Sequence, residues 1–158
     1  MSKTNNDSKN RVSDNFKNRI KDLIDEYGVT ILEFSKIAGV NKEVIFRATN
    51  YSIIPSVRSL LKMANNLNLS LPYLLGTTTE NDLIMSANPS TFHNRLNELS
   101  ENNGIKFSKI ANALGISRNL FYDWIRENTY PSLDYLIDIA EFFKVSIDYL
   151  LGRTDFKN

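Results

Sequence analysis

Apolar side chains recur along this chain at intervals of three and four residues, the spacing that gathers them on one face of an α-helix. Between residues 90 and 103 the apolar positions are Phe92, Leu96 and Leu99, and Asn103-Gly104 ends the pattern. A strand would instead show alternation at every second residue, and these stretches do not. We therefore predict an all-α chain, with one helix over about residues 90–103.

Four more helices are predicted after this one. A second apolar set ends at Gly115, and the three later helices are each preceded by a serine typical of an N-cap: Ser117, Ser132 and Ser146. Glycine is favoured just past a helix end, so Gly152 marks the end of the last one. Residues 90–152 are thus predicted to form five short helices.

The sequence contains an internal repeat. A shift of 76 positions aligns residues 16–78 with residues 92–154, 63 against 63 without a gap, and 16 of the pairs are identical. The identical pairs include Gly39 with Gly115, Pro55-Ser56 with Pro131-Ser132, and residues 73–76 with residues 149–152. Chance does not place these pairs in one shared register, so we predict two tandem five-helix domains.

The first copy carries the same helix signals as the second. Thr30 and Glu33 form a T-x-x-E capping box for its second helix. The expected N-caps of the helices after that are Asn41, Ser56 and Ser70, and the first helix is expected to begin at Ser13 or Asp14.

The first copy has smaller apolar side chains at two inward positions. Ala38 and Ala48 stand where the second copy has Leu114 and Trp124. Large apolar side chains supply most of the burial, so we expect the first copy to be the less stable one.

Three segments lie outside the copies: a polar segment over 1–15, a linker over 79–91 and a tail over 155–158. The basic residues Lys3, Lys9 and Arg11 leave two interpretations of the polar segment, an arm that enters a DNA groove and, the one we expect, an unstructured tail. These lengths leave no room for a third domain, so we expect no separate sensor or catalytic domain.

The linker is long enough to separate the copies widely. The 14 residues from Gly76 to Pro89 span at most about 48 Å when extended. Its apolar residues Leu83, Ile84 and Met85 are expected to pack between the copies and fix their spacing.

Composition excludes several classes of protein. The chain has no cysteine and one histidine, His93, so we expect no disulfide, no metal site and no cofactor, and we interpret His93 as an exposed helix residue. No apolar run approaches the roughly 20 residues of a membrane helix, and the chain start lacks a signal region, so we expect a cytoplasmic protein. The sequence contains neither the spacing of a catalytic nucleophile and base nor a phosphate-binding glycine loop, so we do not expect an enzyme.

Each copy contains two short helices joined by a turn with a glycine, the arrangement of a helix-turn-helix. The turns are Gly39-Val40-Asn41 and Gly115-Ile116-Ser117. Both copies resemble the Cro/CI-type (XRE-family) repressor domain, over about four fifths of the chain. The matching segments are EFSKIAGVNKEVI and LSLPYLLGTT in the first copy, and GIKFSKIANALGISRNLFYDWI and VSIDYLLGRTD in the second. The resemblance implies two tandem lambda-repressor-like DNA-binding domains of bacterial or phage type.

The resemblance also implies which residues pack and which contact DNA. Core positions fall on Phe34, Ser35, Ala38, Gly39, Val40, Ile45 and Ala48, and on Ile110, Ala111, Leu114, Gly115, Ile116, Phe121 and Trp124. DNA-binding positions fall on Thr30, Asn41, Lys42, Glu43, Phe46 and Arg47, and on Lys106, Ser117, Arg118, Asn119, Tyr122 and Asp123. Many relatives carry a glutamine near the start of the second helix, where this chain has Ile31 and Phe107.

The chemistry of the second copy suits base reading. Arg118 can pair with guanine and Asn119 with adenine, while Ser117 and Lys106 can hold phosphates. The first copy has the more favourable charge, net +3 against −1 for the second. The alternative for Arg118 and Asn119 is that they are solvent-exposed residues at the start of a helix and bind nothing.

These observations predict a sequence-specific regulator of transcription, a repressor, that binds double-stranded DNA through the third helix of one or both copies. One chain alone would read a non-palindromic site, because its two third helices differ, whereas a homodimer would read a palindrome. The alternative is a protein–protein interaction module, an anti-repressor or adaptor, which Glu43 and Phe46 favour.

Overall fold

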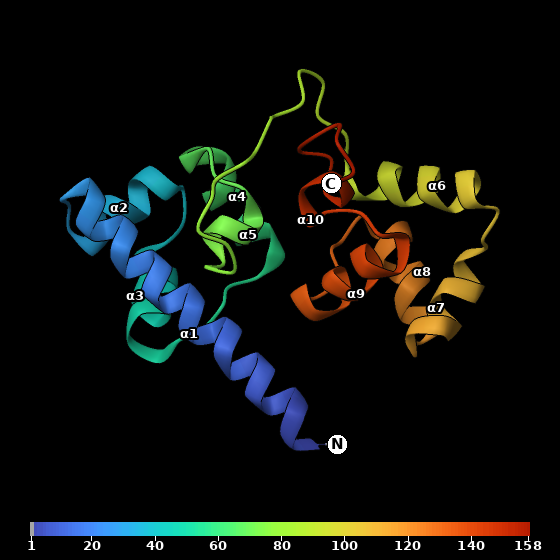
Figure 1. Cartoon of the computed structure of the whole chain (residues 1–158), viewed down its shortest axis with the longest axis horizontal. Coiled ribbons are helices and arrows are strands. Elements are labelled where there is room, and N and C mark those ends of the chain that lie inside the picture. The colour runs from blue at the N-terminus through green and yellow to red at the C-terminus, as the bar shows by residue number, and fades with distance from the viewer. Residues whose placement is uncertain (1) are drawn as a thin grey trace. The chain divides into compact units, whose positions relative to one another are not determined.

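A computed structural model describes the backbone of residues 2–158 and the side chains of residues 11–158. The described chain is all-helical, with ten helices and no strand, as predicted. Figure 1 shows these helices in chain order. The chain divides into two compact units, Met1–Asp82 and Leu83–Asn158. Each unit contains one of the two sequence copies.

Both units contain five helices, as the repeat predicted. The first unit contains α1 (Ser2–Tyr27), α2 (Ile31–Ala38), α3 (Lys42–Tyr51), α4 (Val57–Leu67) and α5 (Leu71–Leu74). The second contains α6 (Phe92–Asn103), α7 (Phe107–Leu114), α8 (Arg118–Arg126), α9 (Leu133–Phe143) and α10 (Ile147–Leu150). In the first unit α3 packs against α1 and α2, and in the second α7 packs against α8.

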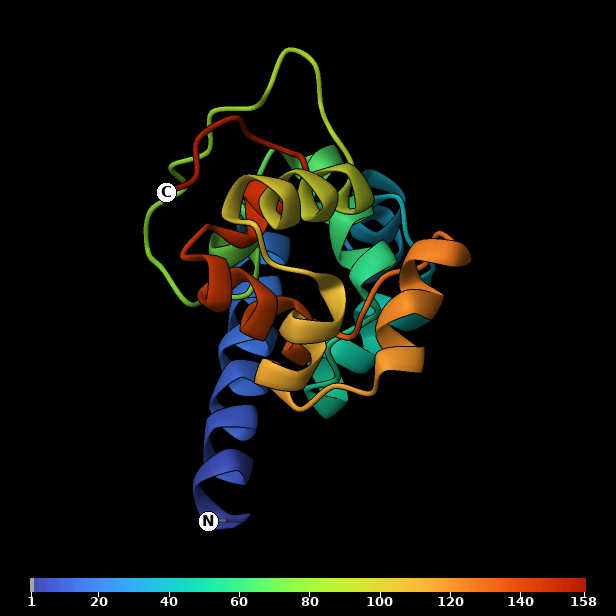
Figure 2. The same cartoon turned by 90° about the vertical axis from the view of Figure 1, so that its right-hand side faces the viewer.

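The first helix is longer than predicted. We expected it to begin at Ser13 or Asp14, after an unstructured tail, but α1 begins at Ser2 and runs unbroken in both views (Figures 1 and 2). Residues 2–13 contain no proline or glycine that would break a helix, so the backbone continues through both proposed caps. The side chains of Lys3 and Lys9, assigned above to a possible arm, lie outside the described residues.

The predicted caps are mostly present. In the capping box, Thr30 Oγ1 accepts from the Glu33 amide and Glu33 Oε2 accepts from the Thr30 amide, both at 3.2 Å. Side chains also accept amide protons at four of the predicted serine caps: Ser56, Ser70, Ser117 and Ser146. Asn41 and Ser132 occupy N-cap positions without a side-chain cap bond.

The repeat register is also the register of the core. Among the pairs of equivalent side chains that are almost completely buried are Phe16 and Phe92, Ile20 and Leu96, Phe34 and Ile110, Ile45 and Phe121, Leu60 and Leu136, Leu74 and Leu150. Four of the implied core positions are not buried, because Val40 and Leu114 are half-buried and Gly39 and Gly115 are exposed. The glycines serve the turn, as described below.

An arginine ties the first helix of each unit to the unit's last turn. Arg19 donates from Nε to the Tyr73 carbonyl (2.9 Å) and from Nη2 to the Thr78 carbonyl (3.0 Å), and its guanidinium lies 4.0 Å from the Tyr73 ring centroid. Arg95 repeats this with the Thr154 carbonyl (3.2 Å) and the Tyr149 ring (4.3 Å). Three of the residues that are identical in the two copies, the arginine, the tyrosine and the threonine, therefore form the same packing contact in both units.

Close approach explains the glycines that end α5 and α10. Gly76 and Gly152 both have positive φ, and a Cβ would lie 2.4 Å from the Asn15 carbonyl oxygen or 2.2 Å from that of Ser90. A side chain at Gly76 would collide with the backbone of α1 itself, and one at Gly152 with the backbone that leads into α6.

The three apolar residues of the linker are at most half-buried. Ile84 is 66% exposed and Met85 is 41% exposed, and Leu83 is half-buried. The expectation that these side chains pack between the copies and fix their spacing stays a prediction. No helix within residues 2–158 is both long and apolar enough to cross a membrane.

Candidate nucleic-acid interface

The second and third helices of each unit are joined by a tight three-residue turn. Gly39 ends α2 with φ +76°, and the Val40 amide then donates to the Ser35 carbonyl at 3.0 Å. Gly115 ends α7 with φ +66°, and the Ile116 amide donates to the Ala111 carbonyl at 2.9 Å. Glycine adopts this left-handed conformation without steric cost, so the sequence dictates where each turn lies.

The third helices have a buried and an exposed face. Ile45 and Ala48 of α3, and Phe121 and Trp124 of α8, are buried. Eleven of the twelve predicted DNA-binding residues are exposed, and Asp123 is half-buried. Packing therefore holds each third helix against its unit and leaves the opposite face open to a ligand.

The first turn of α8 presents polar groups to solvent. Arg118 and Asn119 are neighbours there, and both are exposed. Ser117 Oγ accepts from the Leu120 amide at 3.4 Å, so its hydroxyl proton stays available to a phosphate oxygen. Lys106 occupies the N-cap of α7 without a side-chain cap bond, and its ammonium group is exposed.

Further along α8, two predicted residues have neighbours of their own. The ring of Tyr122 meets Phe107 edge-on, with the centroids 6.2 Å apart. Asp123 forms an ion pair with Arg126 in the last turn of α8. We did not predict a role for Arg126, although its i,i+3 spacing from Asp123 was the signal for this pair.

The exposed face of α3 differs from that of α8. Lys42, Glu43 and Arg47 are exposed and charged. Phe46 is 38% exposed and meets Tyr51, 65% exposed, in a T-shaped contact with the ring centroids 5.9 Å apart. Tyr51 was not among the predicted site residues; its signal in the sequence was an aromatic residue outside the buried stripe. Thr30 uses its Oγ1 lone pair in the capping box.

Comparison with known families gives one match in each unit. Residues 20–74 match a family described as helix-turn-helix, and residues 94–155 match one described as helix-turn-helix domain. The chain carries two tandem helix-turn-helix domains, and the family that the first one matches is of the Cro/CI type. The recognition of the repeat from sequence is thereby confirmed.

Two relatives are also helix-turn-helix proteins. One is the uncharacterized HTH-type transcriptional regulator YobD of Bacillus subtilis (strain 168), 33% identical over 61 residues, which cover 39% of this chain and 54% of the relative. The other is a putative HTH-type transcriptional regulatory protein of Sulfurisphaera tokodaii. It is 24% identical over 132 residues, which cover 65% of this chain and 45% of the relative. The chain spans about half the length of these curated relatives. No solved structure matches.

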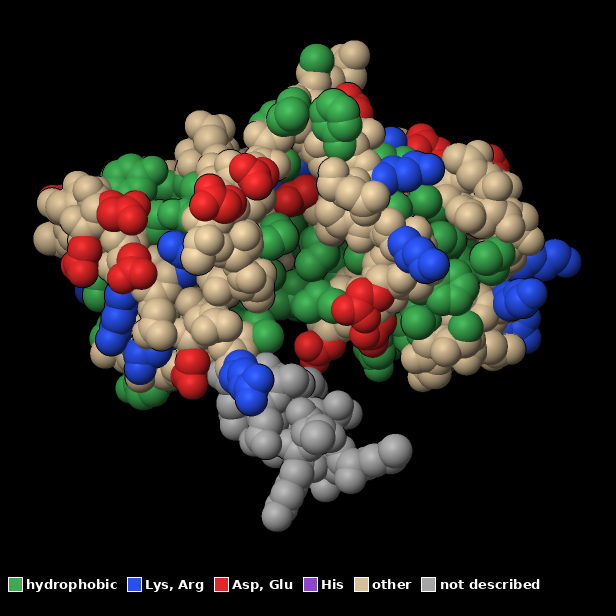
Figure 3. Space-filling view, in the orientation of Figure 1, with side chains coloured by type: hydrophobic (Ala, Val, Ile, Leu, Met, Phe, Trp, Pro, Cys, Tyr) green, Lys and Arg blue, Asp and Glu red, His purple; other side chains and the backbone are tan. Residues whose placement is uncertain are grey.

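The third helices of the two helix-turn-helix domains carry equal charge, although the domains do not. Helix α3 holds Lys42, Arg47 and Glu43, and α8 holds Arg118, Arg126 and Asp123, so each has two basic residues and one acidic residue. On the face that Figure 3 shows, Lys and Arg side chains lie in separate groups among acidic and apolar ones. Each third helix therefore carries more basic than acidic residues, whatever the net charge of its domain.

His93 belongs to the packing of the second helix-turn-helix domain. We interpreted it as an exposed residue, but it is half-buried and its Nε2 lies 2.9 Å from the Thr129 carbonyl oxygen. A carbonyl only accepts, so Nε2 carries the proton. Its ring also lies 6.0 Å from that of Tyr130. This contact draws the segment after α8 toward α6.

Proposed function

We propose that the chain is a sequence-specific, double-stranded DNA-binding regulator of transcription that acts as a repressor. The observation that carries the proposal is the exposed first turn of α8, where Arg118 and Asn119 stand side by side at the start of the second helix of a helix-turn-helix. In this fold the start of that helix lies against base edges in the major groove. The transcriptional regulators that the chain resembles support the same conclusion.

The side chains at this turn suit two kinds of contact. The guanidinium of Arg118 can donate two bonds to O6 and N7 of guanine, and the amide of Asn119 can pair with N6 and N7 of adenine. Lys106 and Ser117 donate to phosphates on either side, which sets the register of the helix but reads no sequence. A domain held in this way blocks a promoter by occupying it.

The first helix-turn-helix domain binds a second half-site through α3. Lys42 and Arg47 supply the positive charge and Asn41 the N-cap next to the groove. Half-sites one helical turn apart are about 34 Å apart, and tandem domains allow one chain to occupy both. The exposed residues of α3 and α8 differ, so the site for one chain is non-palindromic.

The test is a selection of bound duplexes from a random pool at low and moderate salt, with the full chain. We expect two unlike half-sites from the wild type, and loss of the half-site read by α8 from the Arg118→Ala/Asn119→Ala variant. The matched control is Lys62→Ala/Asn97→Ala, which removes one charge and one amide from exposed positions on α4 and α6. Recovery of the same motif by the wild type and the α8 variant would refute the assignment, and a palindrome would indicate a homodimer.

A second candidate function for the first domain is binding to another helix-turn-helix regulator. The exposed pair of Phe46 and Tyr51 favours it, because aromatic residues are enriched at protein interfaces. In that case the selection would yield only the half-site of α8. Phe46→Ala would then weaken association with the partner regulator and leave the selected motif unchanged.

A further inference from the structure

The linker between the two domains is fastened at its start to the first domain. Asn81 accepts a hydrogen bond at Oδ1 from the Ser70 amide (2.8 Å) and donates from Nδ2 to the Asn68 carbonyl (3.1 Å). Both partners lie in the turn between α4 and α5. The side chain of Asn81 thereby holds the linker against the first domain.

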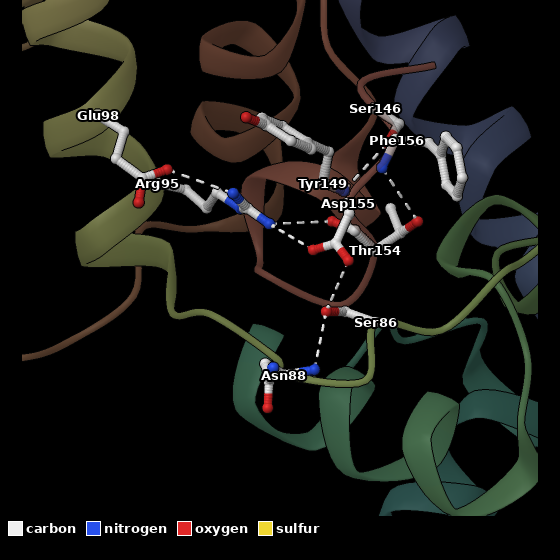
Figure 4. Close-up of polar contacts among 9 residues, drawn as sticks. All are labelled: Ser86, Asn88, Arg95, Glu98, Ser146, Tyr149, Thr154, Asp155 and Phe156. Atoms are coloured by element: carbon white, nitrogen blue, oxygen red, sulfur yellow. Dashed lines mark hydrogen bonds and ion pairs between the residues drawn. The ribbon is translucent and has the colours of Figure 1, made fainter.

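The later part of the linker is fastened to the tail of the second domain. The Ser86 and Ser90 amides donate to the carbonyls of Arg153 and Gly152, both at 2.9 Å. Ser86 also donates from Oγ to Asp155 Oδ2 at 3.0 Å, as Figure 4 shows. Linker and tail therefore run side by side over these residues.

Neighbouring bonds hold the two members of this contact in place. Ser86 Oγ accepts from the Asn88 amide at 3.1 Å, which fixes the turn on the linker side. Asp155 accepts at Oδ1 from Arg95 Nη2 at 3.3 Å, and the Lys157 carbonyl accepts from the Ser146 amide at 2.6 Å. Figure 4 shows Asp155 between Arg95 and Ser86.

Comparison with the first domain shows that this contact is an addition to the repeated plan. Arg19 donates from Nε to a carbonyl, whereas Arg95 Nε is buried without a hydrogen-bond partner and its Nη2 turns to Asp155. The position equivalent to Ser86 in the first copy lies inside α1, and Thr79 is equivalent to Asp155. The repeat alone does not require the contact.

We propose that Ser86 and Asp155 form a latch that limits how far apart the two domains can place their third helices on DNA. With the latch closed, the free spacer is only residues 82–85, and from Asn81 to Ser86 the chain spans at most about 18 Å. Opening the latch also releases the Ser86 amide from the Arg153 carbonyl, and with Ser90 still bound the span from Asn81 to Ser90 rises to about 32 Å. The latch thus determines which half-site spacings one chain accepts, an inference that rests on the proposed function.

The first test measures the spacer without DNA. The chain has no cysteine, so Lys62→Cys and Asp138→Cys, both exposed, place one spin label on each domain. Pulsed electron paramagnetic resonance of the full chain then gives the distribution of distances between the labels. We expect Ser86→Ala/Asp155→Ala to broaden this distribution, and Asp82→Asn, which removes a carboxylate from the spacer, to leave it unchanged. Equal widths for the latch variant and the wild type would overturn the proposal.

The second test measures spacing on DNA with duplexes in which the two selected half-sites are moved apart one base pair at a time. For the wild type we expect affinity to fall about tenfold or more beyond the preferred spacing, and for the latch variant about threefold or less. An identical spacing profile would contradict the latch. If the wild type binds no duplex, the proposed function fails, and the spin-label comparison alone decides whether the latch exists.

Discussion

The two domains share one five-helix plan but are stabilised by different contacts. In the first, Asn66 of α4 donates to the Ala38 carbonyl at 3.0 Å and so caps the end of α2. In the second, Phe142 holds the equivalent position, and the rings of Phe121 and Trp124 fill the core instead, 5.4 Å apart. Turn glycines and caps therefore specify the plan, while the packing around it can use a polar bond from an exposed side chain, as Asn66 does, or buried aromatic rings.

The last turns of the two domains differ in the same way. Asp148 and Arg153 form a buried ion pair beside α10. The equivalent residues in the first domain are Pro72 and Thr77, and there the Thr77 hydroxyl donates to the Pro72 carbonyl at 3.0 Å. A buried pair is costly to break from one side, because the remaining charge stays out of reach of water.

The largest expected effect comes from the aromatic core of the second domain. Phe121→Ala removes a fully buried ring that lies 5.5 Å from that of Phe107. It should lower the free energy of unfolding of this domain by about 3–5 kcal/mol. In the wild type we expect the first domain to unfold at the lower urea concentration, and in this variant we expect the order to reverse.

A urea titration checks this order with two signals. Trp124 is the only tryptophan of the chain, so its fluorescence follows the second domain while circular dichroism follows both. Ile45→Val in the first domain is the control and should cost only about 0.5–1.5 kcal/mol. An unchanged fluorescence midpoint in Phe121→Ala would show that the core of the second domain does not depend on this ring.

A smaller effect is expected where glycine permits close backbone approach. Gly152→Ala and Gly115→Ala both put alanine where the backbone is left-handed, which costs about 1–2 kcal/mol of stability. Only at Gly152 does the new Cβ meet backbone, 2.2 Å from the Ser90 carbonyl, whereas the surroundings of Gly115 are open. Gly152→Ala should therefore destabilise the second domain by about 1–3 kcal/mol more than Gly115→Ala. Equal thermal unfolding midpoints for the two variants would contradict this close approach.

The smallest expected effect is on DNA affinity, and it distinguishes the contribution of α3 from that of α8. Asp123→Asn removes a carboxylate near the expected phosphates and frees Arg126. Affinity for a duplex without the selected motif should rise up to about fivefold at low salt, because one exposed negative charge is removed. The rise should be smaller at high salt, which screens that charge. Glu43→Gln tests the first domain in the same assay. A rise in both variants would mean that both domains lie on DNA, and a rise in Asp123→Asn alone would leave α3 for a protein partner.

Local features of the fold could be predicted from the sequence, but long-range polar contacts could not. The Thr30 capping box and the glycine turns depend on residues within a few positions of each other, so their pattern is visible in the chain. The contact of Arg19 with Tyr73 spans 54 positions, and only the fold brings these residues together. The start of α1 was predicted wrongly, because Ser13 and Asp14 are favoured at caps but do not break a helix, and no proline or glycine precedes them.

The candidate interface was predictable to the same extent. The repeat and the turn glycines located both third helices, and the structure shows their predicted residues on the exposed face. The contacts of Asp123 with Arg126 and of Phe46 with Tyr51 were missed, because the spacing of apolar residues does not determine side-chain conformations on the surface. The latch was missed for a related reason, since it joins Ser86 to a residue 69 positions away.

The central claim is that the first turn of α8 reads bases, and an NMR titration of the full chain with its selected duplex tests it most directly. Backbone amides report each domain separately, so one experiment compares α3 with α8. The account predicts the largest shift changes at residues 117–119, together with changes at Lys106, and their loss in Arg118→Ala/Asn119→Ala. Changes confined to residues outside 106–126 in the second domain, with the duplex fully bound, would contradict it.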